Sequence, residues 1–285
     1  MLGTHVALIR RPTAVVALLL ALAVPLAGCS DGSGPGEPAA SPSATPSAPS
    51  APSAAASSRP STGTCRQLTY REAVAPVDDS EPVSCALEHT ARTFAVDQLD
   101  AVVSGHLLAV DSDRVQQQVA TRCPERLVEF LGGGLEAQRL SVLRAVWFTP
   151  TVEESDAGAD WYRCDVIALA ASEDLAPLTG RLQGILATAA GRERYGLCAT
   201  AEPGTASFRR VICSGPHRWR AISVVDLPSG DYPGEATARE AGQTPCEDAG
   251  RDAADDPLSY RWGYEWPSSE QWAAGQTYGV CWVPA

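Results

Sequence analysis

The cysteines constrain the fold of this chain more than any other feature. The sequence contains nine of them, and eight form two quartets with similar spacings. The gaps are 20, 38 and 41 residues in the first quartet and 15, 33 and 35 residues in the second. The first quartet is Cys65, Cys85, Cys123 and Cys164, and the second is Cys198, Cys213, Cys246 and Cys281. Such an even set predicts four disulfides and an oxidising compartment.

Other residues repeat together with the cysteines. His89 and His217 each follow a cysteine by four residues, and Pro150 and Pro267 each precede the last cysteine of a quartet by 14 residues. Agreement at so many positions indicates a tandem duplication. We interpret residues 65–180 as the first unit and residues 195–285 as the second.

Each unit has the pattern of an antiparallel sheet covered by one helix, so we expect the α+β class with two tandem, disulfide-stapled units. β-Branched and apolar segments in the first unit predict strands at 65–69, 83–85, 90–96, 139–149 and 161–169. Ser112 can begin a helix that ends at the glycines of residues 132–134, and its counterpart in the second unit covers 235–253. Residues 172–194 show no clear pattern. Each unit is small, so disulfides must supplement a modest core.

Three pairing schemes remain if each unit pairs internally and both units pair alike. We favour the scheme that joins neighbouring strands and fastens the helix to the sheet. Its pairs are Cys65–Cys85, Cys123–Cys164, Cys198–Cys213 and Cys246–Cys281.

The residues before the first quartet predict export and a lipid anchor. Residues 1–28 have a basic start and an apolar run that is too short to span a bilayer, as in a signal peptide. The run ends in Leu26-Ala27-Gly28-Cys29, which resembles the lipobox of bacterial lipoproteins. This resemblance implies an acylated Cys29 that binds the lipid bilayer at the extracytoplasmic face of the cell membrane. An ordinary secretory signal is the alternative. Residues 29–64 are rich in Pro, Ala and Ser, which predicts a disordered tether.

Composition argues against several functional classes. The net charge is −12, and the chain has no lysine, which disfavours a nucleic-acid partner. The sequence lacks the hydrolase, zinc-protease and phosphate-loop motifs. We expect no cofactor and no metal, because oxidised cysteines cannot ligate one. Adjacent carboxylates, such as Glu153 and Glu154, have the pattern of solvated surface.

Two groups of side chains are candidates for binding. His89 and His217 could act as bases or ligands near neutral pH, whereas the structural alternative is a hydrogen bond to their own turns. Trp262, Trp266 and Trp272 belong to an aromatic-rich C-terminal stretch that could stack on sugar rings. The alternation of aromatics at 260, 262, 264 and 266 is also what a core-facing strand requires.

The second unit carries a set of motifs in a recognisable order. They are Cys213-Ser-Gly-Pro-His217, Tyr232-Pro-Gly234, Cys246, Trp266-Pro267, Trp272, Gly275 and Cys281. This set resembles the septum formation domain of actinobacterial cell-envelope proteins, and the first unit resembles it more loosely, as a second copy would. One departure is that the glutamate of the family pattern is Arg92 in the first unit and Arg220 in the second.

The resemblance implies a role in septum formation or cell division and brings no reaction with it. The first hypothesis is therefore a non-enzymatic, membrane-anchored binding or scaffold protein whose partner is an envelope protein or a cell-wall glycan. The alternative is a glycan-binding protein or an enzyme that modifies the wall. Convergence of His89, His217 and a carboxylate in one cleft would favour an enzyme.

Overall fold

The computed structural model describes residues 58–285. The predicted signal peptide, Cys29 and most of the predicted tether lie outside the described residues. Ordered pairing begins slightly before the predicted end of the tether. The amide of Gly63 donates to the carbonyl of Thr93, and the amide of Thr93 donates to the carbonyl of Thr64, both at 2.8 Å.

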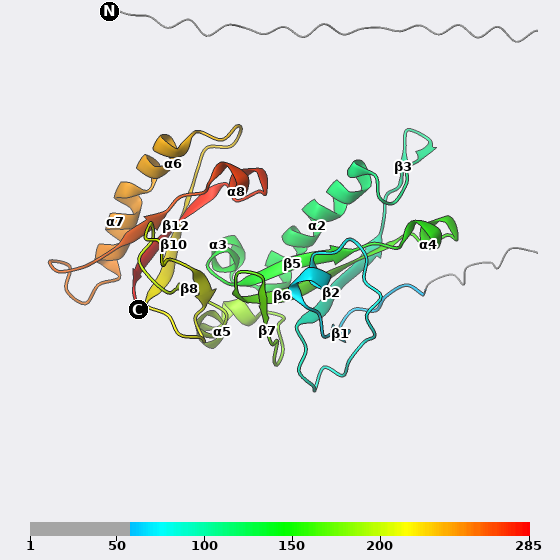
Figure 1. Ribbon diagram of the computed structural model, residues 1–285, viewed down its shortest axis with the longest axis horizontal. Helices are drawn as coiled ribbons and strands as arrows, with labels where there is room; N and C mark the ends of the chain where they lie inside the picture. The colour runs from blue at the N-terminus through cyan, green and yellow to red at the C-terminus, as the bar shows by residue number, and fades with distance from the viewer. Residues whose placement is uncertain (1–57) are drawn as a thin grey trace, which may run out of the picture. The chain divides into compact units, whose positions relative to one another are not determined.

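The first sheet is antiparallel and is built around its longest strand, β6. Its strand order is β1–β2–β6–β5, and β7 also pairs with β6. The bounds are β1 Cys65–Arg66, β2 Ala91–Gln98, β5 Leu143–Phe148, β6 Trp161–Ala171 and β7 Asp174–Ala176. Helix α2, Asp113–Leu131, packs on this sheet through a buried stripe that includes Val115, Val119 and Leu127. Figure 1 shows α2 beside β5 and β6.

The second sheet repeats this arrangement. Its strand order is β8–β10–β12–β11, and β9 pairs with β8. The bounds are β8 Leu197–Ala199, β9 Arg210–Ile212, β10 Trp219–Asp226, β11 Gly263–Glu265 and β12 Tyr278–Pro284. Helices α6, Glu235–Ala241, and α7, Gln243–Asp252, follow β10, and α7 packs against β10, β11 and β12.

Two local details also match between the halves. The register of β2 against β6 shifts between Thr93 and Ala95, and that of β10 against β12 shifts between Ala221 and Ser223. The short helices α4, Val152–Asp156, and α8, Ser269–Ala273, each begin with a capping box. The predicted α+β class, stapled by four disulfides, is confirmed. The duplication itself stays an interpretation.

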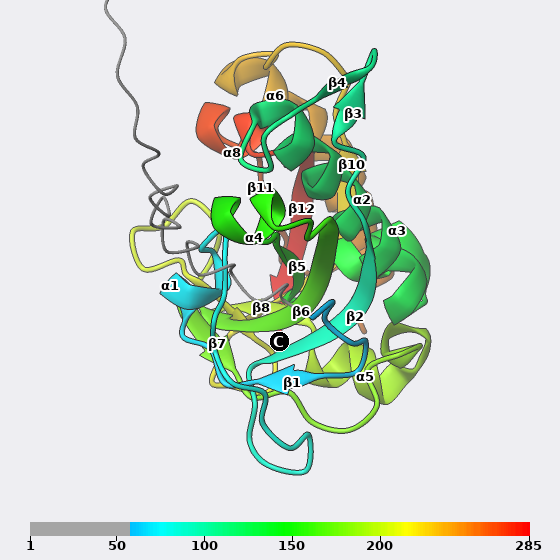
Figure 2. The same cartoon turned by 90° about the vertical axis from the view of Figure 1, so that its right-hand side faces the viewer.

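The remaining short elements connect the two sheets or border them (Figure 2). They are α1 Tyr70–Ala73, β3 Val102–Val103, β4 His106–Leu107, α3 Gly134–Arg139, η1 Ile185–Ala187 and α5 Ala189–Arg194. The segment of residues 172–194, for which the sequence showed no pattern, thus forms β7, η1 and α5.

The two halves share one core. A single buried cluster takes Leu127, Leu143 and Val166 from the first half and Trp219 and Trp282 from the second. The backbone also joins them, because Val142 donates to the carbonyl of Tyr195 and Leu197 donates to that of Leu140, both at 2.8 Å. The entry to β5 is therefore fixed beside the entry to β8.

Three expected elements differ in the structure. The strand expected from residue 139 begins at Leu143, because residues 134–139 form α3. Residues 83–85 contribute only a bridge between Val83 and Cys65. The helix expected over 235–253 breaks at Gly242 into α6 and α7. Pro245 contributes to this break, because it lacks the N–H that would bond to Ala241 and lies in the first turn of α7.

Candidate functional site

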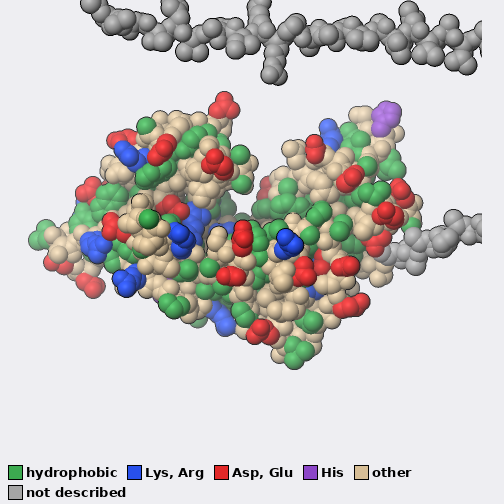
Figure 3. Space-filling model, in the orientation of Figure 1, with side chains coloured by type: hydrophobic (Ala, Val, Ile, Leu, Met, Phe, Trp, Pro, Cys, Tyr) green, Lys and Arg blue, Asp and Glu red, His purple; other side chains and the backbone are tan. Residues whose placement is uncertain are grey.

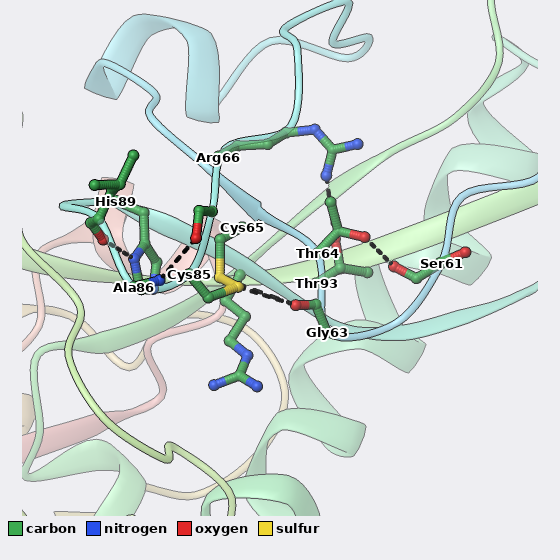
Figure 4. Close-up of a disulfide and its surroundings, with 12 residues drawn as sticks. Ser61, Gly63, Thr64, Cys65, Arg66, Cys85, Ala86, His89 and Thr93 are labelled. Atoms are coloured by element: carbon green, nitrogen blue, oxygen red, sulfur yellow. Dashed lines mark hydrogen bonds between the residues drawn. A yellow bond between two sulfur atoms is a disulfide. The ribbon is translucent and has the colours of Figure 1, made fainter.

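The four disulfides form in the favoured pairing. Cys65–Cys85 and Cys198–Cys213 connect the strands β1 and β8 to the segments before β2 and β10, with Cα–Cα distances of 5.3 and 4.9 Å. Cys123–Cys164 and Cys246–Cys281 tie α2 to β6 and α7 to β12, with Cα–Cα distances of 5.5 and 5.0 Å. Figure 4 shows the first disulfide, with Cys65, Cys85 and His89 in the same region.

Each predicted histidine bonds to its own turn. Nδ1 of His89 lies 2.9 Å from the carbonyl oxygen of Leu87, and Nδ1 of His217 lies 2.8 Å from that of Gly215. Since a carbonyl only accepts, Nδ1 is the donor in both rings. His89 is buried, and the two residues precede strands of different sheets. The structure therefore places them in two similar turns, one in each half.

The arginines that follow the two histidines by three residues make their own contacts. Arg220 donates through Nη2 to Glu193 at 2.6 Å. Arg92 donates through Nη1 to the carbonyl of Gly180 at 3.4 Å. Neither arginine can replace a carboxylate as a proton acceptor.

The predicted tryptophans make intramolecular contacts. Trp262 and Trp266 are half-buried and pack around the Cys246–Cys281 disulfide. The ring of Trp272 meets that of Tyr232 edge-on at 5.8 Å, and its Nε1 donates to the carbonyl of Gly230 at 3.1 Å. The core-facing alternative thus accounts for Trp262 and Trp266, and a role of the three rings in binding stays a prediction.

The sequence reasoning missed a buried ionic network in the first half. Arg163 donates through Nη2 to Asp78 and through Nε to Asp165 at 3.2 Å, and Arg66 Nε lies 3.3 Å from Asp78. The four side chains are at most 9% exposed. In the second half Val280 and Trp282 occupy the positions beside Cys281 that Arg163 and Asp165 occupy beside Cys164. Two charges in a buried apolar strand were the signal that could have revealed this network.

Burial raises the pKa values of the two carboxylates of this network, whereas arginine charges and hydrogen bonds lower them. Burial raises the pKa of Asp165 against the opposing charge of Arg163. Burial also acts to raise the pKa of Asp78, but hydrogen bonds from Arg163 and Ser80 outweigh it and hold that pKa below its usual value. Both carboxylates have arginine partners, although Nε of Arg66 and Oδ1 of Asp165 are buried without a hydrogen bond. The pairing gives the network the character of a structural element.

A cavity of about 320 Å³ lies where the two halves meet, and we call it the inter-sheet cavity. Its apolar wall includes Leu169 of β6, Leu197 of β8 and Phe208. Its charged groups include Arg144 of β5, Arg210 of β9 and Glu265 of β11. Figure 3 shows a surface hollow between the part that carries α8 and the part that carries α2, with arginine side chains in blue near it.

Arg210 and Glu265 form an ion pair in this cavity. Nε of Arg210 lies 3.0 Å from both carboxylate oxygens of Glu265, and its Nη1 donates to Gln276 at 3.2 Å. Nη2 of Arg210 is buried without a hydrogen-bond partner. Burial raises the pKa of Glu265, and the charge of Arg210 opposes this rise.

Arg144 carries the uncompensated charge of the cavity. Its Nη1 donates to the carbonyls of Ser141 at 2.9 Å and Leu143 at 2.8 Å. Within residues 58–285, no carboxylate lies within 4.0 Å of its guanidinium. Burial lowers the pKa of Arg144; the charge of Arg210 adds to this effect, and Tyr278 opposes it. The arrangement suits an anionic ligand.

Two other kinds of site, a membrane-spanning helix and a cluster of metal ligands, would be visible in the described part of the chain. None of its helices has the length and apolar character needed to cross a bilayer. No group of three or more His, Cys, Asp or Glu side chains in residues 58–285 is arranged to hold a metal ion.

Comparison with known proteins identifies the family. A sequence model described as "Septum formation" matches residues 62–281 and so covers both sheets in one stretch. No curated protein and no solved structure matches the chain. Because this match spans most of the 285 residues, the chain belongs to the septum formation family.

Proposed function

We propose that this protein is a lipid-anchored lipoprotein on the extracytoplasmic face of the cell membrane, where it has a non-enzymatic binding or scaffold role in septum formation. Family membership supports the role in the cell envelope and in division. The observation that carries the location is the set of four disulfides. Such a set persists outside the reducing cytosol, in agreement with the signal-like segment that ends at Cys29.

The geometry of the sites favours binding over catalysis. The two histidines are held by their own turns in different halves, and the family's glutamate position carries arginine in both. The inter-sheet cavity instead presents an arginine without a carboxylate partner, which is suited to holding an anion. The partner is an envelope protein or a component of the wall.

One observation favours the alternative of a wall-modifying enzyme. Glu265 lies in a cavity with a raised pKa, as a general acid requires. Glycosidases need a second carboxylate on the other side of the bond that they cleave. Among the described residues that line the cavity, Glu265 is the only acidic one, and both of its oxygens face Arg210. We therefore place binding ahead of catalysis.

The anchor is tested by Cys29→Ala in the producing cells. We expect the wild-type protein in the membrane fraction, with a diacylglyceryl-modified N-terminal peptide in mass spectrometry. The variant should leave the membrane fraction, because it lacks the thiol that accepts the lipid. Ser30→Ala is the matched control and should stay with the membrane. Retention of the Cys29→Ala variant in washed membranes would refute the lipid anchor.

The septal role is tested separately. A fluorescent fusion of the full chain should concentrate at division sites, and depletion of the protein should delay or misplace septa. An even distribution around the cell together with normal septa after depletion would contradict the proposal. This outcome does not depend on whether Cys29 carries lipid.

A further inference from the structure

We propose that the inter-sheet cavity binds the free terminal carboxylate of a peptide that ends in a small apolar residue, with Arg144 as the side chain that holds the carboxylate. This inference deepens the proposed binding function and rests on it. It names the chemistry of the ligand, which neither the family nor the sequence motifs supply.

The charges of the cavity favour a single negative group. Arg210 is paired with Glu265, so the charge that stays without a counter-ion is that of Arg144. Arg209 adds a second positive group among the lining residues, but it is exposed to solvent. An unpaired, largely enclosed cation is unusual in a chain of net charge −12, because acidic partners are abundant. One carboxylate would neutralise the charge of Arg144, whereas a doubly charged phosphate would also be repelled by the carboxylate of Glu265.

The guanidinium of Arg144 has a free hydrogen-bonding edge. Both of its hydrogen bonds to the protein leave from Nη1. Its Nε and Nη2 have no acceptor among the described residues, and neither is among the buried unpaired atoms, so both are accessible. Nε and Nη2 form one edge of the planar group, which matches the two oxygens of a carboxylate. Its Nη1 bonds hold this edge in place before a ligand arrives.

The wall beside this edge selects an apolar residue. Leu169, Leu197 and Phe208 can cover the side chain and Cα of a terminal residue. A volume of about 320 Å³ is at the small end of ligand sites, which suits the last one or two residues of a peptide and not a sugar polymer. Gln271, also on the wall, accepts from the amide of Ser268 through Oε1, and its Nε2 can donate to the carbonyl of the last peptide group.

The test measures peptide binding to the full-length protein, purified from membranes in detergent, by isothermal titration calorimetry. The probes are acetyl-Ala-Ala with a free carboxylate and the same peptide with an amidated end. We expect the free acid to bind and the amide to bind at least tenfold more weakly. Arg144→Gln should weaken the acid at least tenfold. Arg251→Gln, the same change at an exposed arginine of α7, should leave the affinity unchanged.

A second variant keeps the test decisive if Arg144→Gln does not fold. Arg144→Lys retains the positive charge but cannot form a bidentate pair with a carboxylate. The affinity of this variant for the free acid should therefore lie below that of the wild type. Near-ultraviolet circular dichroism verifies that each variant is folded. Equal affinities of wild type and folded Arg144 variants would overturn the proposal.

Peptides with different terminal residues distinguish the possible sources of such a carboxylate. A peptide that ends in L-alanine represents a protein C-terminus, and one that ends in D-alanine represents a stem peptide of the bacterial wall; preferential binding of either supports the inference. Equal binding of acid and amide, no binding of any peptide, or stronger binding of inorganic phosphate would overturn it. None of these results would contradict septal localisation or the acylation of Cys29. The peptide-binding proposal and the proposed function are therefore tested independently.

Discussion

The ring of Tyr264 lies between two glycines, Gly242 at the junction of α6 and α7 and Gly279 in β12. A Cβ atom at either glycine would run into this ring, so the helices and the sheet approach each other only because both positions lack a side chain. The hydroxyl of Tyr264 donates to the carbonyl of Ala238 at 3.1 Å, and the residue is 5% exposed. One aromatic residue thus links α6, α7 and the second sheet.

The burial of Tyr264 predicts that the folded protein loses stability at alkaline pH. Burial raises the pKa of Tyr264 to about 12, against about 10 in an unfolded chain. Since the folded state disfavours the phenolate, the contribution of Tyr264 is complete below about pH 10 and is lost as the pH rises through about 12. We expect the free energy of unfolding to fall by about 3 kcal/mol over this range from this group alone.

Urea denaturation over the alkaline range tests this expectation. Tyr264→Phe should cost about 1 kcal/mol at neutral pH through the lost hydrogen bond, and should flatten the alkaline decline. Tyr260→Phe, at a more exposed tyrosine of the same segment, is the matched control and should leave the decline in place. An unchanged slope in Tyr264→Phe would show that another group causes the decline.

Single residues were predictable where a pattern or a resemblance fixes them. Cysteine spacing left three pairing schemes, and the favoured one is the scheme that forms. The alternation of aromatics led to the core-facing alternative that Trp262 and Trp266 follow. The ionic network of Arg163 and Asp165 was not predictable in this way. Its partner Asp78 belongs to a loop, and nothing in the sequence indicates which face of the sheet that loop covers.

At the level of elements, the disulfides close loops of different lengths around similar sheets. Cys123–Cys164 encloses a separation of 41 residues and Cys198–Cys213 one of 15. A crosslink that restricts the unfolded chain contributes about 4 kcal/mol for the longer loop and about 3 kcal/mol for the shorter one. Replacing both cysteines of each pair by alanine should therefore lower the free energy of unfolding by these amounts, in this order.

Denaturant titrations of the two paired variants, followed by far-ultraviolet circular dichroism, measure the difference. The two variants are controls for one another, because each replaces two buried or nearly buried cysteines. A larger cost for the shorter loop would mean that packing around Cys198–Cys213, and not chain entropy, determines the contribution.

Helix boundaries followed the sequence when local signals were strong. Ser112 and the glycines after Leu131 bound α2 as expected. The break at Gly242 could not be predicted from Pro245 alone, because Pro124 lies inside the unbroken helix α2. The helix α3 was not predicted, because its residues lie between the glycines that end α2 and the strand expected from residue 139 and show no apolar period of their own.

Across the whole folded part, the two sheets cannot be treated as separate domains. The two sheets have similar strand orders, in agreement with the repeated sequence pattern, but that pattern carries no signal for the joint between the sheets. That joint depends on residues 140–142 and 195–197, which pair through the backbone, and on side chains from the segment 172–194. Backbone pairing carries no residue signature, so neither the joint nor the inter-sheet cavity beside it could be read from the sequence.

The shared core predicts that the two halves unfold together. Leu186 of η1 is fully buried in the cluster that also contains Val166 of the first sheet and Trp282 of the second. Leu186→Ala should lower the free energy of unfolding by about 2–5 kcal/mol, because it leaves a cavity in this joint core. The backbone amides of β6 and β12 should then both lose protection from hydrogen exchange. Calorimetry should show one unfolding transition for residues 58–285.

Leu258→Ala makes the same chemical change at a side chain that is 95% exposed, and it should alter stability by less than about 0.5 kcal/mol. A loss of protection confined to one sheet in Leu186→Ala, or two separate calorimetric transitions in the wild type, would show independent halves. Joint unfolding has a consequence for the inter-sheet cavity, whose walls come from both sheets. A ligand in that cavity would stabilise both halves at once, so bound peptide should raise the single transition without splitting it.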